Sequence, residues 1–167
     1  MITKQNSITT RDVALMGVML AIIETVKFSL SFIAGVEVVT LLFILYTLFF
    51  EKKMVYFLPA FLLTEGMLNG FSIWWLMYVY IWSILVLITY LFRKHKSILF
   101  WSIISGMFGS LFGLLCCPIY FITNGVQTGI AWWIAGVPTD IIHGISNFIM
   151  CMILFIPLKK ILDRIKK

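Results

Sequence analysis

Three polar side chains stand close together in an otherwise apolar stretch that runs from Gly129 to Asn147. Asp140, His143 and Asn147 are spaced i, i+3 and i+7, so a helix places all three on one face. An ionisable group at membrane depth needs a partner, water or a ligand, and we therefore treat these residues as a candidate binding site. The alternative is that Asp140 and His143 pair with each other or with a neighbouring helix and only lock the packing.

The same residues could also serve a chemical reaction, as a general base or as metal ligands. Two ligands on one helix face make a weak metal site when no third candidate accompanies them. The sequence has no GxxxxGK[ST] phosphate loop, no HExxH metal helix and no GxSxG nucleophile turn. We therefore expect no catalytic residue, no metal and no cofactor in this chain, and the protein is not expected to be an enzyme.

The composition is that of a membrane protein. The chain has 167 residues, of which 62% are hydrophobic and 12% charged, and its mean hydropathy is +1.05. One domain is expected over residues 1–167. The net charge of +6 comes from basic residues in short clusters between apolar runs, which favours a role in membrane topology over nucleic-acid binding. Cys116, Cys117 and Cys151 lie in apolar segments and are interpreted as small core residues.

Six apolar segments predict a compact bundle of six transmembrane helices. Their approximate bounds are 12–33, 38–50, 54–68, 71–92, 98–120 and 138–158. The first helix is expected to begin near Thr10, because Thr9 and Asp12 form a capping arrangement. Residues 122–137 are predicted to form a partly helical outer cap, with Pro138 in the first turn of the last helix.

Small residues recur along one face of the predicted fifth helix. Ser102, Gly106, Gly109 and Gly113 follow at steps of four, three and four, which is typical of a surface that lets another helix approach closely in lipid. We interpret this face as a packing groove.

The basic residues predict the orientation of the bundle. Those on one face are Lys4, Arg11, Lys52, Lys53, Arg93, Lys94, Lys96 and the basic tail after Pro157. The three opposite connections contain no Lys or Arg. By the positive-inside rule both termini are cytoplasmic, and the amphipathic tail suits a membrane surface.

This topology brings the unusual polar and aromatic residues to the outer half of the membrane. A pocket lined by aromatic rings with a few polar groups is the usual construction for binding a small organic molecule. Besides Asp140, His143 and Asn147, the candidates are Glu37, Glu65, Trp74, Trp75, Trp132 and Trp133. Glu24 and Lys27, inside the first span, can pair at i, i+3, or Lys27 can lie near a ligand anion.

Three segments together resemble the substrate-binding S-component of an energy-coupling factor transporter. They are Ala14–Ala21 (ALMGVMLA), Gly35–Leu42 (GVEVVTLL) and Gly136–Asn147 (GVPTDIIHGISN). The resemblance extends over nearly the whole chain and implies a six-helix protein of the bacterial cell membrane that captures a vitamin or similar micronutrient from outside. It also implies a membrane coupling subunit and two ATPase subunits as partners, so ATP is used by those subunits and not by this chain.

The resemblance further implies a docking surface for the coupling subunit on the first helix. The family places alanines four residues apart there, and the matching positions read Gly17 and Ala21, with Ala14 one turn earlier. Both Gly and Ala permit close helix approach, but the departure leaves the docking register open.

The ligand and two other function classes stay open at this stage. A pyridoxine-like or thiamin-related heterocycle fits the candidate groups, and cobalamin is a further alternative. A stand-alone secondary transporter could use Glu24, Glu65 or Asp140 as a proton relay, although the two halves show no clear repeat. An intramembrane enzyme would require chemistry that depends on Asp140 and His143.

Overall fold

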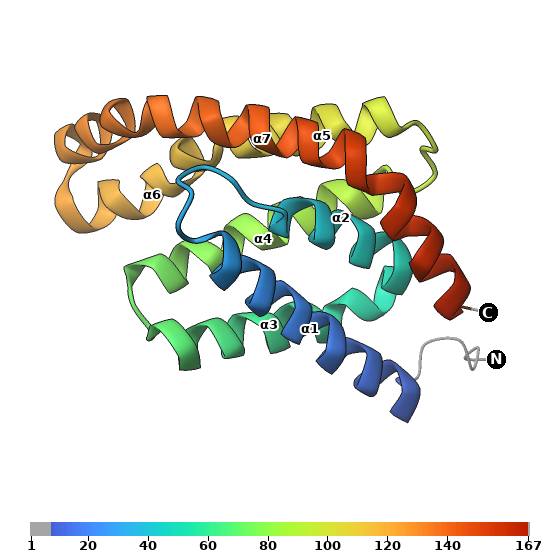
Figure 1. Cartoon of the computed structure of the whole chain (residues 1–167). Helices are drawn as coiled ribbons and strands as arrows, with labels where there is room; N and C mark the ends of the chain where they lie inside the picture. Colours follow the sequence, from blue (N-terminus) through green and yellow to red (C-terminus); the bar gives the residue numbers. More distant parts are fainter. Residues whose placement is uncertain (1–7, 167) are drawn as a thin grey trace.

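The computed structural model describes residues 8–166 and consists of helices joined by short turns (Figure 1). Within this range there is no strand, which confirms the predicted all-α fold class. Lys4 and Lys167, which contributed to the predicted topology, lie outside the described residues. The elements are α1 (Thr10–Leu30), α2 (Val39–Phe50), the 3-10 helix η2 (Glu51–Lys53), α3 (Met54–Asn69), α4 (Ile73–Leu91), α5 (Ile98–Ser110), α6 (Phe112–Asn124) and α7 (Val126–Lys166).

The first helix begins where the capping pattern predicts. Thr9 Oγ1 accepts a hydrogen bond from the Asp12 backbone N–H at 3.2 Å, and the Thr9 N–H donates to Asp12 Oδ2 at 2.8 Å. These two bonds satisfy backbone donors that would otherwise lack partners at the start of the helix. The predicted start near Thr10 is therefore confirmed.

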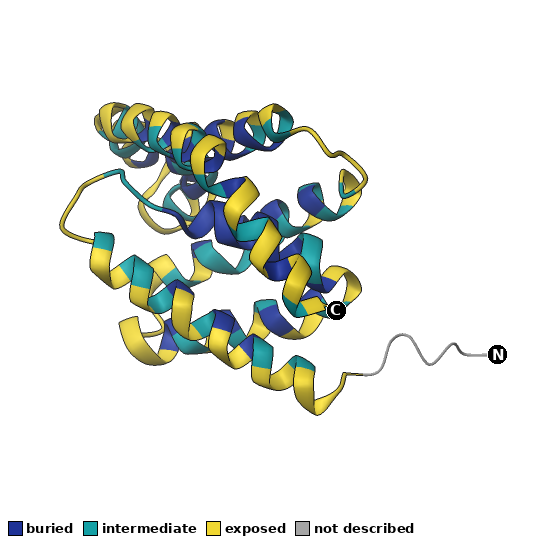
Figure 2. Ribbon diagram, turned by 45° about the vertical axis from the view of Figure 1, so that its right-hand side comes forward, coloured by how far each residue is buried: buried dark blue, intermediate teal, exposed yellow. Residues whose placement is uncertain are grey.

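Four helical segments are long and apolar enough to cross a membrane: α1, α4, the α5–α6 pair and α7. Figure 2 shows exposed residues along the outer side of the helices. Large apolar side chains are among them: Phe28 in α1 is 74% exposed and Ile122 in α6 is 81% exposed. Large apolar side chains on the outside suit lipid rather than water. The chain is an all-helical membrane protein.

The remaining two predicted spans are shorter. α2 has 12 residues and α3 has 16, which correspond to about 18 and 24 Å, against about 30 Å for the hydrocarbon core. α2 is buried over its first nine residues, Val39 to Thr47, so other helices rather than lipid surround it. The count of six spans is not established by helix length and stays a prediction.

The structure corrects the predicted boundaries in the C-terminal half. The expected fifth span is divided at Leu111 into α5 and α6, and the separate cap over 122–137 is absent. Residues 126–166 instead form one helix, α7, with Pro138 and Pro157 inside it. A proline removes one backbone hydrogen bond, but ending the helix would leave several groups unpaired, which costs more in an apolar environment. Figure 1 shows α7 bent rather than straight, as prolines in long helices commonly cause.

The predicted packing groove is where α5 meets α7. Ser102, Gly106 and Gly109 are buried, and a Cβ built on Gly106 would lie 3.1 Å from Phe148 Cβ and 3.2 Å from the Gly144 carbonyl oxygen. No larger side chain fits at this separation, so the small residues set the distance between the two helices. The packing interpretation of this face is confirmed.

The basic connections gather at one end of the bundle. The start of α1, η2, the α4–α5 connection and the end of α7 lie toward the right in Figure 1, while the α3–α4 and α6–α7 turns lie toward the left. The sequence analysis likewise placed the basic residues at one end of the bundle and used this to predict its orientation. The side of the membrane on which this end lies stays a prediction.

The close approach of α5 and α7 makes a first prediction. Gly144→Ala places a Cβ 3.0 Å from both the Gly106 carbonyl oxygen and Ser110 Cβ, so it should lower the free energy of unfolding by about 1–3 kcal/mol. Gly136→Ala, on the same helix, has no heavy atom within 4 Å of the new Cβ and should not destabilise the protein. Thermal unfolding of both variants in detergent, followed by circular dichroism, measures this; equal melting temperatures would contradict the packing account.

Candidate functional site

A cavity of about 520 Å³ lies where the α1–α2 connection, α4, α6 and α7 meet. Five of the residues predicted from the sequence line it: Glu37, Trp74, Trp132, Asp140 and His143. The other lining residues are Gly35, Val36, Phe112, Gly113, Ala135, Gly136 and Thr139. Residues separated by more than a hundred positions therefore surround one space of the size that binds small organic ligands.

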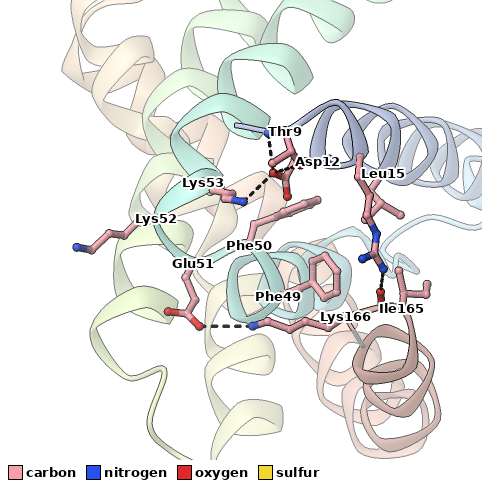
Figure 3. A pocket seen from close by; sticks show the side chains of 11 residues that line it. Thr9, Asp12, Leu15, Phe49, Phe50, Glu51, Lys52, Lys53, Ile165 and Lys166 are labelled. Carbon is pink, nitrogen blue, oxygen red and sulfur yellow. Dashed lines mark hydrogen bonds and ion pairs between the residues drawn. The ribbon is translucent and has the colours of Figure 1, made fainter. Parts of the chain in front are cut away.

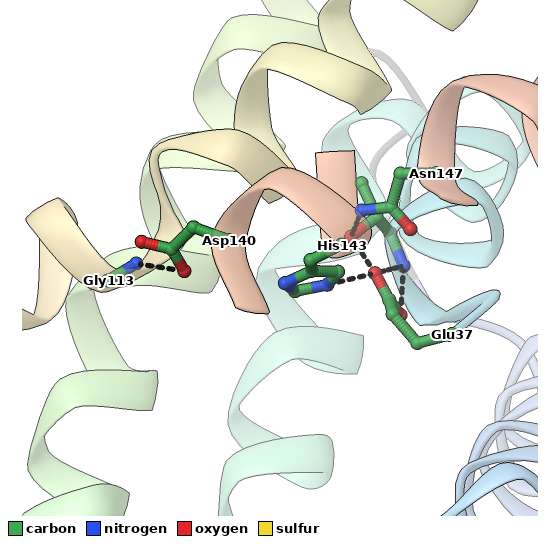
Figure 4. Close-up of polar contacts among 6 residues, drawn as sticks. Glu37, Gly113, Asp140, His143 and Asn147 are labelled. Carbon is green, nitrogen blue, oxygen red and sulfur yellow. Dashed lines mark hydrogen bonds and ion pairs between the residues drawn. The ribbon is translucent and has the colours of Figure 1, made fainter. Parts of the chain in front are cut away.

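Glu37 and His143 join the α1–α2 connection to α7 (Figure 4). His143 Nε2 lies 3.2 Å from Glu37 Oε1, and the Thr40 backbone N–H donates to Glu37 Oε2 at 3.0 Å. The hydroxyl of Thr40 also donates to Glu37. Burial raises the pKa of Glu37, but the hydrogen bond and charge of His143 and the two Thr40 donors outweigh it, so the pKa lies below its usual value. The carboxylate is thus held ionised beside the imidazole.

Asp140 points to a different neighbour. Its Oδ1 accepts a hydrogen bond from the Gly113 backbone N–H at 3.2 Å, while its Oδ2 is buried and has no hydrogen-bond partner among the described residues (Figure 4). Asp140 and His143 therefore do not pair with each other, contrary to one of the two alternatives drawn from the sequence. The same alternative also allowed pairing with neighbouring elements. His143 pairs in this way with Glu37, whereas Asp140 uses only one of its two oxygens, which binds Gly113.

Asn147 lies on the predicted face of α7 but not in the cavity. Its Nδ2 donates to Thr40 Oγ1 at 3.2 Å, and it is 2% exposed. The shared inward face of Asp140, His143 and Asn147 is therefore confirmed. Asn147 is linked to the cavity through Thr40, because the Thr40 hydroxyl in turn donates to Glu37.

Aromatic rings form the walls of the cavity. Trp74 from α4 meets Trp132 from α7 edge to face, with ring centroids 6.1 Å apart, and Trp132 stacks on Tyr120 at 4.3 Å. Phe112 lies 5.5 Å from the His143 ring. Sequence reasoning missed Phe112 and assigned Gly113 only to the packing face, since an aromatic residue and a glycine in an apolar helix carry no sign that they line a cavity.

The remaining tryptophans lie elsewhere. Trp133 does not line the cavity, although it is the next residue after Trp132. Trp75 donates its indole N–H to the Leu62 carbonyl oxygen at 2.7 Å and so ties α4 to α3. Of the four predicted tryptophans, the structure brings Trp74 and Trp132 to this cavity, whereas Trp75 lines a second, smaller cavity.

Glu65 lines a second, smaller cavity of about 250 Å³, which shares Trp74 with the first. Lys27 forms an ion pair with Glu65, and Asn69 Nδ2 donates to the other carboxylate oxygen of Glu65 at 2.8 Å. Glu24 is a more distant partner of Lys27, at 3.9 Å. The predicted pairing of Lys27 within its own helix is thus secondary to a pairing between α1 and α3.

A third cavity, of about 500 Å³, lies at the basic end of the bundle (Figure 3). Four of the charged side chains that line it are paired: Lys53 with Asp12 at 2.7 Å, and Lys166 with Glu51 at 3.6 Å. Arg11 donates to the carbonyl oxygen of Ile165. These contacts join α1, η2 and the end of α7, so we interpret this region as structural: it holds the three elements together.

Metal-ligating residues do not gather in the described part of the chain. Within residues 8–166, no group of three or more His, Cys, Asp or Glu side chains is arranged to hold a metal ion. Cys116, Cys117 and Cys151 are buried and free, which agrees with their interpretation as small core residues.

No known protein family, curated protein or solved structure matches this chain. The function is therefore argued from the cavities, the buried polar groups and the surface of the chain itself.

The Lys27–Glu65 pair makes a second prediction. Lys27→Met leaves the carboxylate of Glu65, 4% exposed, without its cation, and should destabilise the protein by about 3 kcal/mol. The double variant Lys27→Met/Glu65→Leu should recover most of this loss, because no buried charge then remains unpaired. Lys159→Ala breaks the exposed Lys159–Asp163 pair and should change stability by less than about 0.5 kcal/mol. Unfolding free energies of the wild type and the three variants in detergent test the pairing; a double variant no more stable than Lys27→Met would refute it.

Proposed function

We propose that this protein is the substrate-binding S-component of an energy-coupling factor transporter in the bacterial cell membrane. It captures a vitamin or related micronutrient from outside the cell and delivers it inward together with a membrane coupling subunit and two ATPase subunits. The observation that carries the proposal is the cavity in which Glu37, Trp74, Trp132, Asp140 and His143 meet, as the sequence predicted for an outer binding site.

The arrangement of the bundle supports a capture role from one side. In the proposed topology α2 and α3 complete six spans, and the basic ends of α1, η2 and α7 face the cytoplasm. The cavity is built from the α1–α2 connection, α6 and the N-terminal part of α7, which belong to the opposite half of the molecule. A ligand arriving from outside then meets the cavity first.

The surface of α1 supports the proposed docking of a coupling subunit. Ala14, Gly17 and Ala21 are all exposed, and a Cβ built on Gly17 would meet no heavy atom within 4 Å. This exposed face of small residues therefore leaves room for another helix to approach. This face does not line the cavity, so ligand binding and docking use separate surfaces.

The size and lining of the cavity favour a ligand with one or two rings. A volume of about 520 Å³ lies within the range of small-molecule sites, and two tryptophans supply stacking surface. Pyridoxine-like and thiamin-related compounds are of this size, whereas a cobalamin would extend well beyond the walls of the cavity.

A stand-alone proton-coupled transporter is the second candidate function. It is favoured by two buried carboxylate oxygens without hydrogen-bond partners among the described residues, Glu24 Oε1 and Asp140 Oδ2, because unpaired carboxylates are suited to taking up protons. Glu65, the third predicted relay group, is instead engaged by Lys27 and Asn69. Uptake into proteoliposomes driven by a pH gradient, without ATPase subunits, would establish this alternative and overturn the first.

Neighbouring tryptophans provide a matched test of the cavity. The small molecule retained after mild purification is identified by mass spectrometry and then titrated back onto the stripped protein by calorimetry. Trp132→Ala removes a cavity wall and should weaken binding at least tenfold, about 1.4 kcal/mol, as should His143→Ala. Trp133→Ala, one residue further on, should leave the affinity within about threefold of wild type. Equal losses at Trp132 and Trp133 would place the ligand elsewhere.

The docking face makes a separate prediction for transport. Ala21→Leu should leave ligand binding unchanged and abolish ATP-dependent uptake by the reconstituted complex, because the larger side chain prevents close helix approach. Ala131→Leu makes the same change at an exposed position of α7 that lines no cavity and should transport normally. Loss of binding in the Ala21 variant would indicate misfolding, and normal uptake would remove α1 as the docking face.

A further inference from the structure

We propose that the 520 Å³ cavity selects an organic cation, a positively charged ring compound with an N–H group that donates to the free oxygen of Asp140 between the aromatic walls. The inference rests on the proposed capture function, since it names the chemical class of the molecule that this same site receives.

One carboxylate oxygen of Asp140 has no hydrogen-bond partner among the described residues. Asp140 is 8% exposed, its Oδ1 is occupied by the Gly113 backbone N–H, and its Oδ2 receives no hydrogen bond from residues 8–166. Burying a carboxylate oxygen without a donor is energetically costly, so such an oxygen is rarely retained without a partner. Because Asp140 lines the cavity, a ligand in the cavity is a partner that can supply the missing donor.

Residues 8–166 place no cation beside this oxygen. No Lys or Arg lines the cavity. His143, one turn away on α7, is bound to Glu37, and Lys27 in the neighbouring cavity is bound to Glu65. The carboxylate of Asp140 is therefore left for something from outside the described chain.

The residues that line the cavity favour a cation by their charge. Its ionisable side chains are Glu37, Asp140 and His143, and Glu37 already balances His143 if the imidazole is protonated. The cavity therefore carries at least the one negative charge of Asp140 when that carboxylate is ionised. A ligand with a phosphate or carboxylate would be repelled, whereas a cation would be attracted.

The aromatic residues that line the cavity also favour a cation. Trp74 and Trp132 meet edge to face, and Phe112 lines the cavity next to His143. The faces of aromatic rings attract cations, tryptophan most strongly, and this attraction grows when water is excluded. One buried carboxylate together with two tryptophans is a combination that discriminates by charge as well as by shape.

Gly113 holds the carboxylate in this position. A Cβ built on Gly113 would overlap the Asp140 carboxylate, with Cγ at 3.0 Å, so only glycine leaves room for it. Gly113→Ala would push the carboxylate away from its backbone donor while leaving the charge in place. This variant therefore tests whether binding needs the carboxylate in its exact position, whereas Asp140→Asn tests whether binding needs the negative charge.

Pyridoxamine and pyridoxine provide the probes, because they differ only in an ammonium group against a hydroxyl on the same ring. Calorimetry on the purified protein in detergent should give an affinity for pyridoxamine at least tenfold higher than for pyridoxine, with thiamine as a second cationic probe. Asp140→Asn should reduce the preference to less than threefold, and Gly113→Ala should weaken pyridoxamine binding. Asp163→Asn makes the same chemical change on the exposed tail and should keep the full preference.

Several outcomes overturn the inference. They are equal affinities for the two pyridoxine compounds, no binding of either cationic probe, or an Asp140→Asn variant that keeps the preference. If a neutral ring compound binds and depends on Trp132, the cation preference fails while the capture function stands. If the cations bind but the complete transporter does not take them up with ATP, the capture function fails while the cation site stands.

Discussion

Lipid offers no hydrogen bonds, and this constraint determines where the ionisable side chains of the helices point. Lys27 reaches from α1 to Glu65 on α3, and His143 reaches from α7 to Glu37 before α2. Each contact satisfies a polar group and at the same time joins elements that are far apart in the sequence. Asp140 gives the cavity its character, because one of its carboxylate oxygens has no donor among the described residues.

Glycines determine both the packing of α7 against α5 and α6 and the construction of the cavity. Gly106 and Gly144 let the helices approach, and Gly113 leaves room for the carboxylate of Asp140. A cavity wall built this way is fixed by backbone positions rather than by flexible side chains, so its polar groups are held in place before a ligand arrives. The position of the site therefore follows from the packing of the C-terminal half.

The two ends of the bundle have different chemistry. At one end, Asp12, Glu51, Lys53 and Lys166 are paired and hold α1, η2 and α7 together. At the other, the cavity combines aromatic rings with acidic side chains and contains no Lys or Arg. In the proposed function this polarity separates the end that receives the ligand from the end that faces the cytoplasm, and the exposed small residues of α1 form a third, independent surface.

The sequence by itself determined the properties that depend on local pattern. Hydropathy predicted an all-helical membrane protein, Thr9 and Asp12 predicted the start of α1, and the spacing of Asp140, His143 and Asn147 predicted their common face. Helical periodicity fixes which residues of one helix point together, whatever that helix packs against.

Only the tertiary structure decided which groups meet across helices. It selected Glu65 over Glu24 as the partner of Lys27, and Trp132 over Trp133 as a cavity wall, because adjacent residues of a helix point about 100° apart and only the neighbours decide which side is inside. It also continued α7 through Pro138, since the cost of unpaired backbone groups in an apolar surrounding outweighs the local preference of one proline to begin a helix.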